Sequence, residues 1–217
     1  GTSGPRIISR FFAGWDFPED LCQSSNRIEH AYAGGVPMGS ILPNKLGAQV
    51  RPTFLVTASQ DAGTPTTPGT PLQRLQVIKG WVDASGQRHE RVVDVAGNAD
   101  NGAAVDLQSC ATSGSGFADL CTVWVDKDFD PSERAYYYSR AVENPTCRWS
   151  QRMCAAAGVN CARPETISDG YEGCCVGEHR PIVQERAWSS PVWYSPASAT
   201  DSGALGVSAS RVNGSSN

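Results

Sequence analysis

Three aspartates alternate with other residues at Asp126, Asp128 and Asp130. This spacing matches the first three acidic positions of a calcium-binding loop. The pattern then fails, because Pro131 stands where such a loop needs glycine and no glutamate occupies its twelfth position. Lys127 also brings a positive charge into the set. We therefore interpret the stretch as a solvated turn after a strand, and its aspartates as only weak candidate metal ligands.

The histidines and serines form no catalytic pattern. His30, His89 and His179 lie far apart, and none has a ligand neighbour at helical or strand spacing, so we expect surface or hydrogen-bonded histidines. The chain has no Gly-x-Ser-x-Gly elbow and no phosphate-binding loop. The sequence therefore predicts no catalytic residue and no cofactor site in this chain.

Cysteine is the most informative residue type in the composition. The number of cysteines is even, and no Cys-x-x-Cys pair is present, which disfavours a zinc ribbon or a redox motif. Disulfides and a secreted, periplasmic or cell-surface location are expected instead. The cysteines are Cys22, Cys110, Cys121, Cys147, Cys154, Cys161, Cys174 and Cys175.

Two local disulfides are predicted from short loops. Cys110 with Cys121, and Cys147 with Cys154, can each close a short loop if the ends lie on neighbouring strands or on a strand and a helical turn. Each bond would stabilise the fold by ~2–3 kcal/mol.

The adjacent pair Cys174 and Cys175 should not bond to each other, because that ring is strained. If the stretch is extended, their side chains diverge and join two different segments. Cys161 and Cys22 are their predicted partners.

Tryptophan is in excess, and two interpretations compete. Exposed tryptophans would form a platform on which sugars stack, whereas buried ones would each add a large apolar area to a core. Most lie on expected strands beside other apolar residues, which favours the core. The six are Trp15, Trp81, Trp124, Trp149, Trp188 and Trp193.

Composition limits the partners. The chain of 217 residues has a net charge of −4 and a pI of about 5.4, which argues against nucleic acid or an anionic membrane as partner. No apolar run approaches the ~20 residues of a membrane span, and no signal peptide is evident. Because the chain begins at Gly1 without methionine, we expect the downstream part of a longer protein.

The elements that would hold these residues are mostly short strands. A tyrosine-rich strand begins at Arg134 and ends before Asn144-Pro145, with Cys147 and Trp149 directly after it. One helix is expected over 150–157, capped by Ser150 and ended by Gly158; Gly34-Gly35 and Pro37 argue against a helix in 16–40. The strands at 72–83 and 89–95 should form a hairpin. The stretch 182–194 should form a pair of strands or one strand broken at Pro191. The remaining expected strands span 6–15, 51–59 and 121–126.

Many short strands separated by turns predict an all-β fold. We expect an Ig-like or jelly-roll-like β-sandwich over residues 1–194, with one short helix and long disulfide-bearing loops. Residues 195–217 form a tail rich in serine, glycine and alanine. In it, Leu205, Val207 and Ala209 alternate with small residues, so we expect the tail to dock as an added strand or an arm on its own domain or on a neighbouring copy.

Four stretches together resemble one bacterial family. They read TSGPRI at 2–7, PLQRLQVIKGWVD at 71–83, ENPTCRWS at 143–150 and QERAWSSPVWY at 184–194. They resemble the C-terminal part of the domain-of-unknown-function family 3604, over nearly all of residues 1–196. The resemblance implies a metallohydrolase of the polymerase-and-histidinol-phosphatase (PHP) type, whose divalent-metal ligands lie in an upstream barrel. This chain has no His-x-His, so no catalytic residue carries over to it.

The expected function is therefore that of a non-catalytic C-terminal domain of an exported protein resembling PHP-type metal-dependent hydrolases. It would pack on the upstream barrel or shape the rim of the barrel's active site. Two alternatives belong to other classes. One is a structural subunit of an extracellular assembly, with copies joined through the tail. The other is a carbohydrate-binding module that uses exposed tryptophans.

Overall fold

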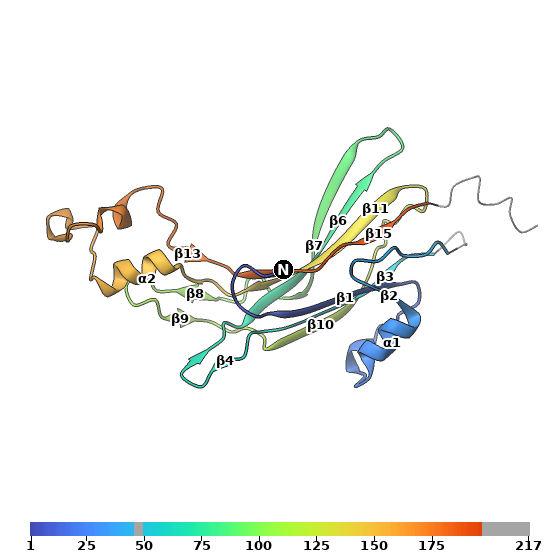
Figure 1. Cartoon of the computed structure of the whole chain (residues 1–217), viewed down its shortest axis with the longest axis horizontal. Helices are drawn as coiled ribbons and strands as arrows, with labels where there is room; N and C mark the ends of the chain where they lie inside the picture. Colours follow the sequence, from blue (N-terminus) through green and yellow to red (C-terminus); the bar gives the residue numbers. More distant parts are fainter. Residues whose placement is uncertain (46–49, 197–217) are drawn as a thin grey trace, which may run out of the picture.

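A computed structural model describes residues 1–45 and 50–196 of the chain (Figure 1). The protein is mainly β, with several antiparallel sheets, as predicted. Two larger sheets form the body. A lobe rich in disulfides, made of residues 104–113 and 146–183, lies at one end of the molecule, and the β6–β7 hairpin rises at the other (Figure 1).

The smaller body sheet has four strands in the order β10-β3-β1-β2. Phe11 of β1 and Phe54 of β3 stack with ring centroids 5.4 Å apart on the face that looks toward the second sheet. Phe12 and Leu55, one residue along, point to the opposite face and belong to a second core. The strands are β1 (Ile8–Gly14), β2 (Gly35–Pro37), β3 (Thr53–Ser59) and β10 (Asp119–Val125).

The larger body sheet has five strands in the order β14-β11-β6-β7, with β15 also paired to β11. The predicted hairpin is confirmed: β6 (Leu72–Val82) and β7 (Arg88–Gly97) pair antiparallel around a turn in which Gly86 has a φ of +82°, with a register shift between Leu75 and Gln76. β7 is an edge strand, and its charged side chains protect the edge from pairing with other chains.

The tyrosine-rich strand is β11 (Arg134–Glu143), at the centre of this sheet. Its small residues and Tyr137 face the core between the two sheets, whereas Tyr136 and Tyr138 face outward and are half-buried. Since successive side chains alternate between faces, one strand contributes both to the core and to an outer aromatic surface.

The last stretch forms three short strands rather than one broken strand or a pair. They are β13 (Ile182–Val183), β14 (Arg186–Trp188) and β15 (Val192–Tyr194). β14 pairs with residues 140–142 of β11 and β15 with residues 135–137. The interruption before Pro191 thus lets one segment line both halves of the same strand.

A helix lies where none was expected. α1 (Arg27–Gly34) covers the outer face of the four-stranded sheet, with Ala31 buried and Tyr32 edge-on to Phe12 at 4.8 Å. The glycines end this helix instead of preventing it. Gly35 then starts β2 so close to the Ala13 carbonyl that a Cβ would overlap it. The prediction was wrong because a helix stop was interpreted as a breaker of the whole region.

The disulfide lobe is built from short elements. Its strands are β8 (Ala104–Val105), β9 (Thr112–Ser113), β12 (Thr146–Cys147) and β13, and its helices are α2 (Trp149–Ala156), η2 (Pro164–Thr166) and η3 (Glu172–Cys175). The remaining short elements are η1 (Leu21–Gln23), β4 (Gly63–Thr64) and β5 (Thr67–Pro68).

The predicted helix after the tyrosine strand is confirmed as α2, although its cap is not. The N-cap residue is Arg148, without a side-chain cap hydrogen bond, so Ser150 lies inside the helix. Gly158 follows the last turn with a φ of +66° and donates to the Ala155 carbonyl, as a helix-ending glycine does.

All eight cysteines are paired, but neither predicted local bond forms. Cys110 joins Cys147, and Cys121 joins Cys22 across a sequence separation of 99 residues. Cys154 joins Cys174 instead of Cys147. Short sequence separation did not predict the disulfide partners. The folded sheets place cysteines from distant segments side by side, whereas the two predicted pairs, which are close in sequence, lie further apart in space.

The prediction for the adjacent cysteines is confirmed in part. Cys174 and Cys175 do not bond to each other, and Cys175 joins Cys161 as one of the two predicted partners. Cys174 joins Cys154, so Cys22 was wrongly assigned to this pair. The two sulfur atoms anchor one short η3 turn to two different segments.

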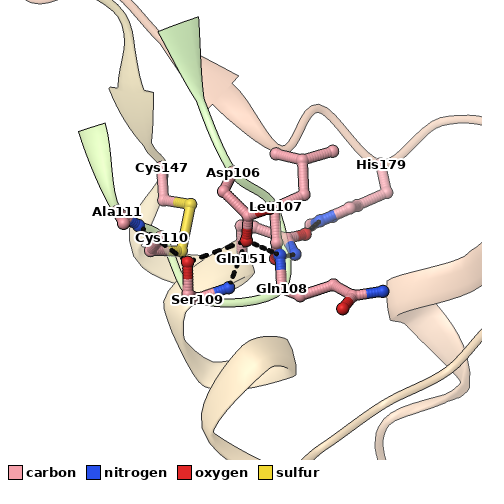
Figure 2. Close-up of a disulfide and its surroundings, with 9 residues drawn as sticks. All are labelled: Asp106, Leu107, Gln108, Ser109, Cys110, Ala111, Cys147, Gln151 and His179. Carbon is pink, nitrogen blue, oxygen red and sulfur yellow. Dashed lines mark hydrogen bonds between the residues drawn. A yellow bond between two sulfur atoms is a disulfide. The ribbon is translucent and has the colours of Figure 1, made fainter. Parts of the chain in front are cut away.

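Hydrogen bonds reinforce the Cys110–Cys147 bridge (Figure 2). Asp106 accepts from the backbone of Ser109 and shapes the loop in which Cys110 has a φ of +57°. Gln151 of α2 donates to the Leu107 carbonyl at 2.7 Å and contacts His179 at 3.0 Å (Figure 2). Three segments of the lobe are therefore tied together around one disulfide.

Four disulfides indicate an oxidising location outside the cytoplasm. Within residues 1–45 and 50–196, no helix has the length and apolar character needed to cross a membrane. The predicted docking of the tail concerns residues 197–217, which lie outside the part that the structure describes.

Candidate functional site

Of the three candidate aspartates, only the first is buried in the body of the protein. Asp126 is buried at 2% exposure, and its Oδ2 lies 2.6 Å from Lys79 Nζ. The Tyr137 hydroxyl donates to the same oxygen at 2.7 Å. Burial, and next the nearby Asp126 carboxylate, raise the pKa of Tyr137 far above its usual value. The group ties β6, β11 and the end of β10 together and is not a solvated turn at this position.

The other two aspartates lie on the surface with partners of their own. Asp128 pairs with Arg91 of β7, and Asp130 accepts from the Ser132 hydroxyl at 2.6 Å. These hydrogen bonds lower the pKa of both carboxyls. The three aspartates therefore do not converge, and the described part of the chain holds no grouping of three or more His, Cys, Asp or Glu side chains suited to a metal ion.

The three histidines lie in three separate places and each has a hydrogen-bond partner, as predicted. His30 contacts Asn26, His179 contacts Gln151, and His89 Nε2 lies 2.7 Å from Asp83 Oδ2. Asp83 also accepts from Ser85 in the β6–β7 turn, and these hydrogen bonds, from Ser85 first and then His89, strongly lower its pKa. Each histidine is thus part of local structure.

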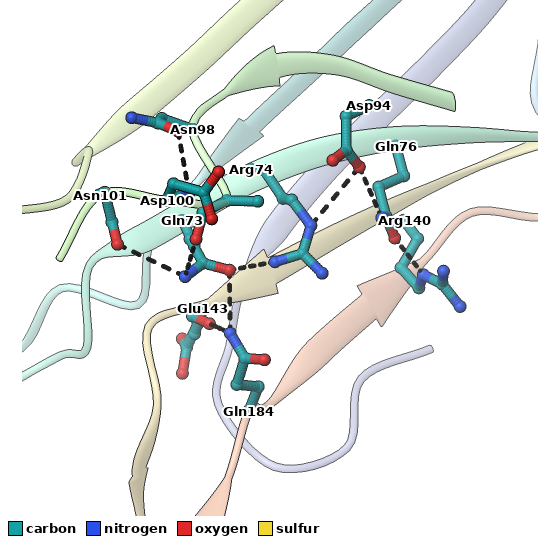
Figure 3. Close-up of polar contacts among 11 residues, drawn as sticks. Gln73, Arg74, Gln76, Asp94, Asn98, Asp100, Asn101, Arg140, Glu143 and Gln184 are labelled. Carbon is teal, nitrogen blue, oxygen red and sulfur yellow. Dashed lines mark hydrogen bonds and ion pairs between the residues drawn. The ribbon is translucent and has the colours of Figure 1, made fainter. Parts of the chain in front are cut away.

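A partly buried polar network occupies the opposite end of the five-stranded sheet (Figure 3). Gln184 donates to Gln73 Oε1 at 2.9 Å and to the Glu143 carbonyl at 3.0 Å. Further along, Gln76 donates to Asp94 at 2.6 Å and accepts from Arg140 at 2.7 Å (Figure 3). These contacts link β6, β7 and β11 to the segment that leads into β14.

Glu143 is the exception in this network. Its side chain is 2% exposed, and Oε1 has no hydrogen-bond partner within the described residues. Burial, followed by the nearby carboxylates of Glu185 and Asp61, raises the pKa of Glu143 to about 7. The carboxyl is therefore partly protonated near neutral pH.

The tryptophans divide between core and surface. Trp15, Trp81 and Trp124 pack against the core between the sheets, but they are only partly buried, and Trp188 is half-buried. Trp149, on α2, is 75% exposed and Trp193, on β15, is 48% exposed. The expectation of a tryptophan core is correct for three residues. Trp193 instead lines a groove on the surface of the body.

Trp193 belongs to a row of residues that crosses the outer face of the five-stranded sheet. The strand registers place Ile41 beside Trp193, Trp193 beside Tyr136, and Tyr136 beside Gly80. The Trp193 and Tyr136 rings are 5.5 Å apart and inclined at 50°. A Cβ on Gly80 would overlap the Tyr136 ring, so the ring lies directly over this glycine.

A second row lies two residues further along the same face. Here Arg134 of β11 pairs with Val82 of β6, and Val82 pairs with Arg88 of β7. Both arginines are exposed, and neither has an ion-pair partner in the part of the chain that the structure describes. Together the two rows enclose a groove of about 460 Å³ that we call the aromatic groove. Its lining includes Gly80, Val82, Arg88, Arg134, Tyr136 and Trp193.

A hollow of similar size, about 530 Å³, lies in the disulfide lobe. Its walls come from α2 and the loops that carry Cys161 and Cys174. Its polar side chains are Gln108, Gln151, Asn160, Arg163 and His179. Gln151 and His179 already bond to each other. The aromatic groove, with free guanidinium groups beside two aromatic rings, is the better-formed binding surface.

Comparison with known families gives one match. The family described as "Protein of unknown function (DUF3604)" matches residues 1–196. The chain belongs to this family. No curated protein and no solved structure matches the chain. The family assignment predicted from the four sequence stretches is thus confirmed, and residues 1–196 of this DUF3604 member include the whole aromatic groove.

Sequence reasoning alone did not find this groove. Trp193 was recognised as a possible sugar-stacking residue, but Tyr136 and Arg134 were interpreted only as parts of a strand, and Gly80 and Arg88 were not considered. The alternation along β11 is a signal that places Arg134, Tyr136 and Tyr138 on one face. Which neighbours complete that face depends on the registers of β6, β7 and β15.

Proposed function

We propose that the chain is a non-catalytic domain of an exported protein and packs on a preceding barrel that resembles PHP-type metal-dependent hydrolases, of the phosphoesterase kind. In this proposal the divalent metal belongs to the barrel. The motifs in 2–7 and 143–150 support it, because they resemble the region that follows such a barrel. The ionisable side chains support it too, since Lys79, Asp126 and the histidines serve local structure.

We also propose that the domain is a β-sandwich. Side chains of both body sheets share a single core, which includes Phe11 and Phe54 from one sheet and Val77, Tyr137 and Val192 from the other. Two antiparallel sheets packed face to face in this way have the architecture of a sandwich. The more specific Ig-like or jelly-roll-like connectivity is part of the proposal.

The observation that carries the proposed function is the anchoring of the first residues. The Gly1 nitrogen lies 2.9 Å from the Trp188 carbonyl oxygen, and the Trp188 N–H donates to the Gly1 carbonyl at 2.8 Å. Thr2 bridges to Ala187, and Ser3 donates to the Arg186 carbonyl at 2.9 Å. This arm extends the five-stranded sheet beside β14. A domain attached through Gly1 would be held close to the sheet with little freedom to swing.

The test uses the complete product of the gene. Limited proteolysis near Gly1 should yield two fragments that stay together in size-exclusion chromatography, because the domains share an interface. Metal-dependent hydrolysis of a phosphoester should remain with the upstream fragment after separation in mild denaturant and refolding. A complete product without a barrel upstream of Gly1, or two fragments that separate at once, would overturn the proposal.

A further inference from the structure

We propose that the aromatic groove binds an acidic saccharide, a glycan stretch that carries uronic acid residues. The sugar rings stack on Trp193 and Tyr136, and the carboxylates pair with Arg88 and Arg134. This inference goes beyond the proposed function and is independent of it, because it concerns a ligand of this chain itself.

The aromatic floor has the shape that a sugar ring needs. Tyr136 lies over Gly80, so one side of its ring is covered by the sheet and its opposite side is directed outward. Trp193, 48% exposed, is inclined to it at 50°. Pyranose rings present a face of C–H groups that packs on the electron-rich face of an aromatic ring, with hydroxyl groups left in water. Two inclined rings can therefore hold two consecutive units of a twisted glycan chain.

The arginines add a charge preference. Arg134 lies two positions from Tyr136 along β11, about 7 Å at the rise of a strand. Arg88 lies on β7 and pairs with Val82, two positions beyond Gly80, so it is about 8 Å from Gly80 across one strand spacing. Long side chains at these two positions can reach carboxylates on the edges of a sugar stacked over Tyr136 and Gly80. Guanidinium groups bind carboxylates through paired, charge-assisted hydrogen bonds. Neutral sugars offer no carboxylate for these paired bonds.

The other charges near the groove do not cancel this preference. Glu90 lies beside Gly80 on β7 and brings one negative charge to the edge of the floor. Asp83 carries a further negative charge, but it is bonded to Ser85 and His89 in the turn, and strand alternation places it on the side of Trp81, opposite to Gly80 and Val82. Arg88 and Arg134 outnumber Glu90, so the net charge of the groove is positive although the whole chain has a net charge of −4. A local positive surface on an acidic protein favours an anionic ligand.

The groove also stays clear of the joint that the proposed function requires. The N-terminal arm pairs with β14, which pairs with residues 140–142 of β11, whereas β15 and the groove adjoin residues 134–136. Tyr136 and Arg140 are four residues apart, about 13 Å along the strand. The volume of about 460 Å³ lies within the range of small-ligand sites, roughly 300–1,000 Å³.

The experiment titrates the full chain with a tetrasaccharide of galacturonic acid and with the neutral cellotetraose, by calorimetry and by NMR. We expect the acidic sugar to bind about tenfold more tightly than the neutral one, and salt to weaken only the acidic complex. Trp193→Ala should weaken binding of the acidic sugar by about tenfold or more. The matched control is Trp149→Ala, which removes a more exposed tryptophan on α2 and should leave binding unchanged.

A second pair of variants separates charge from stacking. Arg88→Gln combined with Arg134→Gln should bring the acidic sugar down to the affinity of the neutral one while the neutral affinity is unchanged. Circular dichroism and melting of each variant verify the fold. The proposal is overturned if the wild type binds neither sugar, if it binds both equally well, or if Trp193→Ala binds as the folded wild type does. None of these results bears on the fragments of the complete gene product.

Discussion

Lys79 Nζ and Asp126 Oδ2 lie 2.6 Å apart with side-chain exposures of 6% and 2%. The two residues come from β6 and from the end of β10, so the pair joins the two body sheets at their shared border. Lys79 also donates to the Asp128 carbonyl at 3.1 Å and lies over the Trp81 ring at 5.1 Å. Its charge is thus balanced by a single buried carboxylate, with polar and aromatic groups around it.

Replacing that carboxylate should destabilise the protein strongly. Asp126→Asn leaves the Lys79 ammonium buried without its partner, for which we expect a loss of about 3–5 kcal/mol in the free energy of unfolding, measured in urea. Combining Asp126→Asn with Lys79→Met should recover part of the lost free energy of unfolding, because the unpaired ammonium is no longer buried. Asp130→Asn, on the surface, is the control and should change stability by less than about 0.5 kcal/mol. Equal losses in the two single variants would contradict this role.

Stability should depend on pH through Glu143. Its pKa is raised from 4.5 to about 7, so the folded protein holds a proton that the unfolded chain has released. The stabilisation is complete below the unfolded pKa and is lost as pH rises through about 7. The total loss is on the order of 3 kcal/mol.

Glu143→Gln should remove that part of the pH dependence and make the protein more stable than wild type at pH above about 8. Chemical denaturation at several pH values measures the effect. The exposed Glu165→Gln is the control and should follow the wild-type curve. A Glu143→Gln variant that parallels the wild type over the whole range would show that this carboxyl does not titrate as described.

The disulfides should differ in their contribution to stability. Cys22–Cys121 closes a separation of 99 residues and Cys161–Cys175 one of 14. On a chain-entropy account, replacing the first pair with serines should cost about 2 kcal/mol more than replacing the second. Non-reducing peptide mapping checks the connectivity, and urea unfolding of the two double variants checks the order. The reverse order would show that native packing, and not loop closure, decides the effect.

The isolated chain should hydrolyse no phosphoester, with or without added divalent metal. A catalytic zinc site of the hydrolytic kind uses about three protein ligands and one open position, and the proposed function assigns the metal to the upstream barrel. A chromogenic phosphoester assay tests this. Turnover that depends on metal and disappears in His30→Ala, His89→Ala or His179→Ala would refute the prediction.

The tail should influence assembly. The alternation of Leu205, Val207 and Ala209 predicts a segment that can add to a sheet edge. Deleting residues 205–217 and measuring mass in solution distinguishes docking on a neighbouring copy, which predicts a lower mass, from docking on the same domain. A truncated chain with unchanged mass and unchanged melting temperature would exclude both forms of docking.

Local patterns along the sequence were enough to predict most of the body. Residue alternation marks β3 and β11, because a strand exposes successive side chains to opposite faces. Strand-forming residues mark β1, β6 and β7. The turn at 83–87 is readable from Ser85-Gly86, and α2 from its helix formers and Gly158. The even number of cysteines predicts disulfides, and the strain of an adjacent pair excludes a Cys174–Cys175 bond.

What depends on contacts between distant segments was decided only by the tertiary structure. Cys22 meets Cys121, and Lys79 meets Asp126, because the sheets place residues together that the sequence separates widely. α1 forms where its apolar side can cover Phe12 and Leu55, which no local glycine rule anticipates. The aromatic groove has the same origin: alternation along β11 orients Tyr136, but only the strand registers bring Trp193, Arg88 and Gly80 beside it.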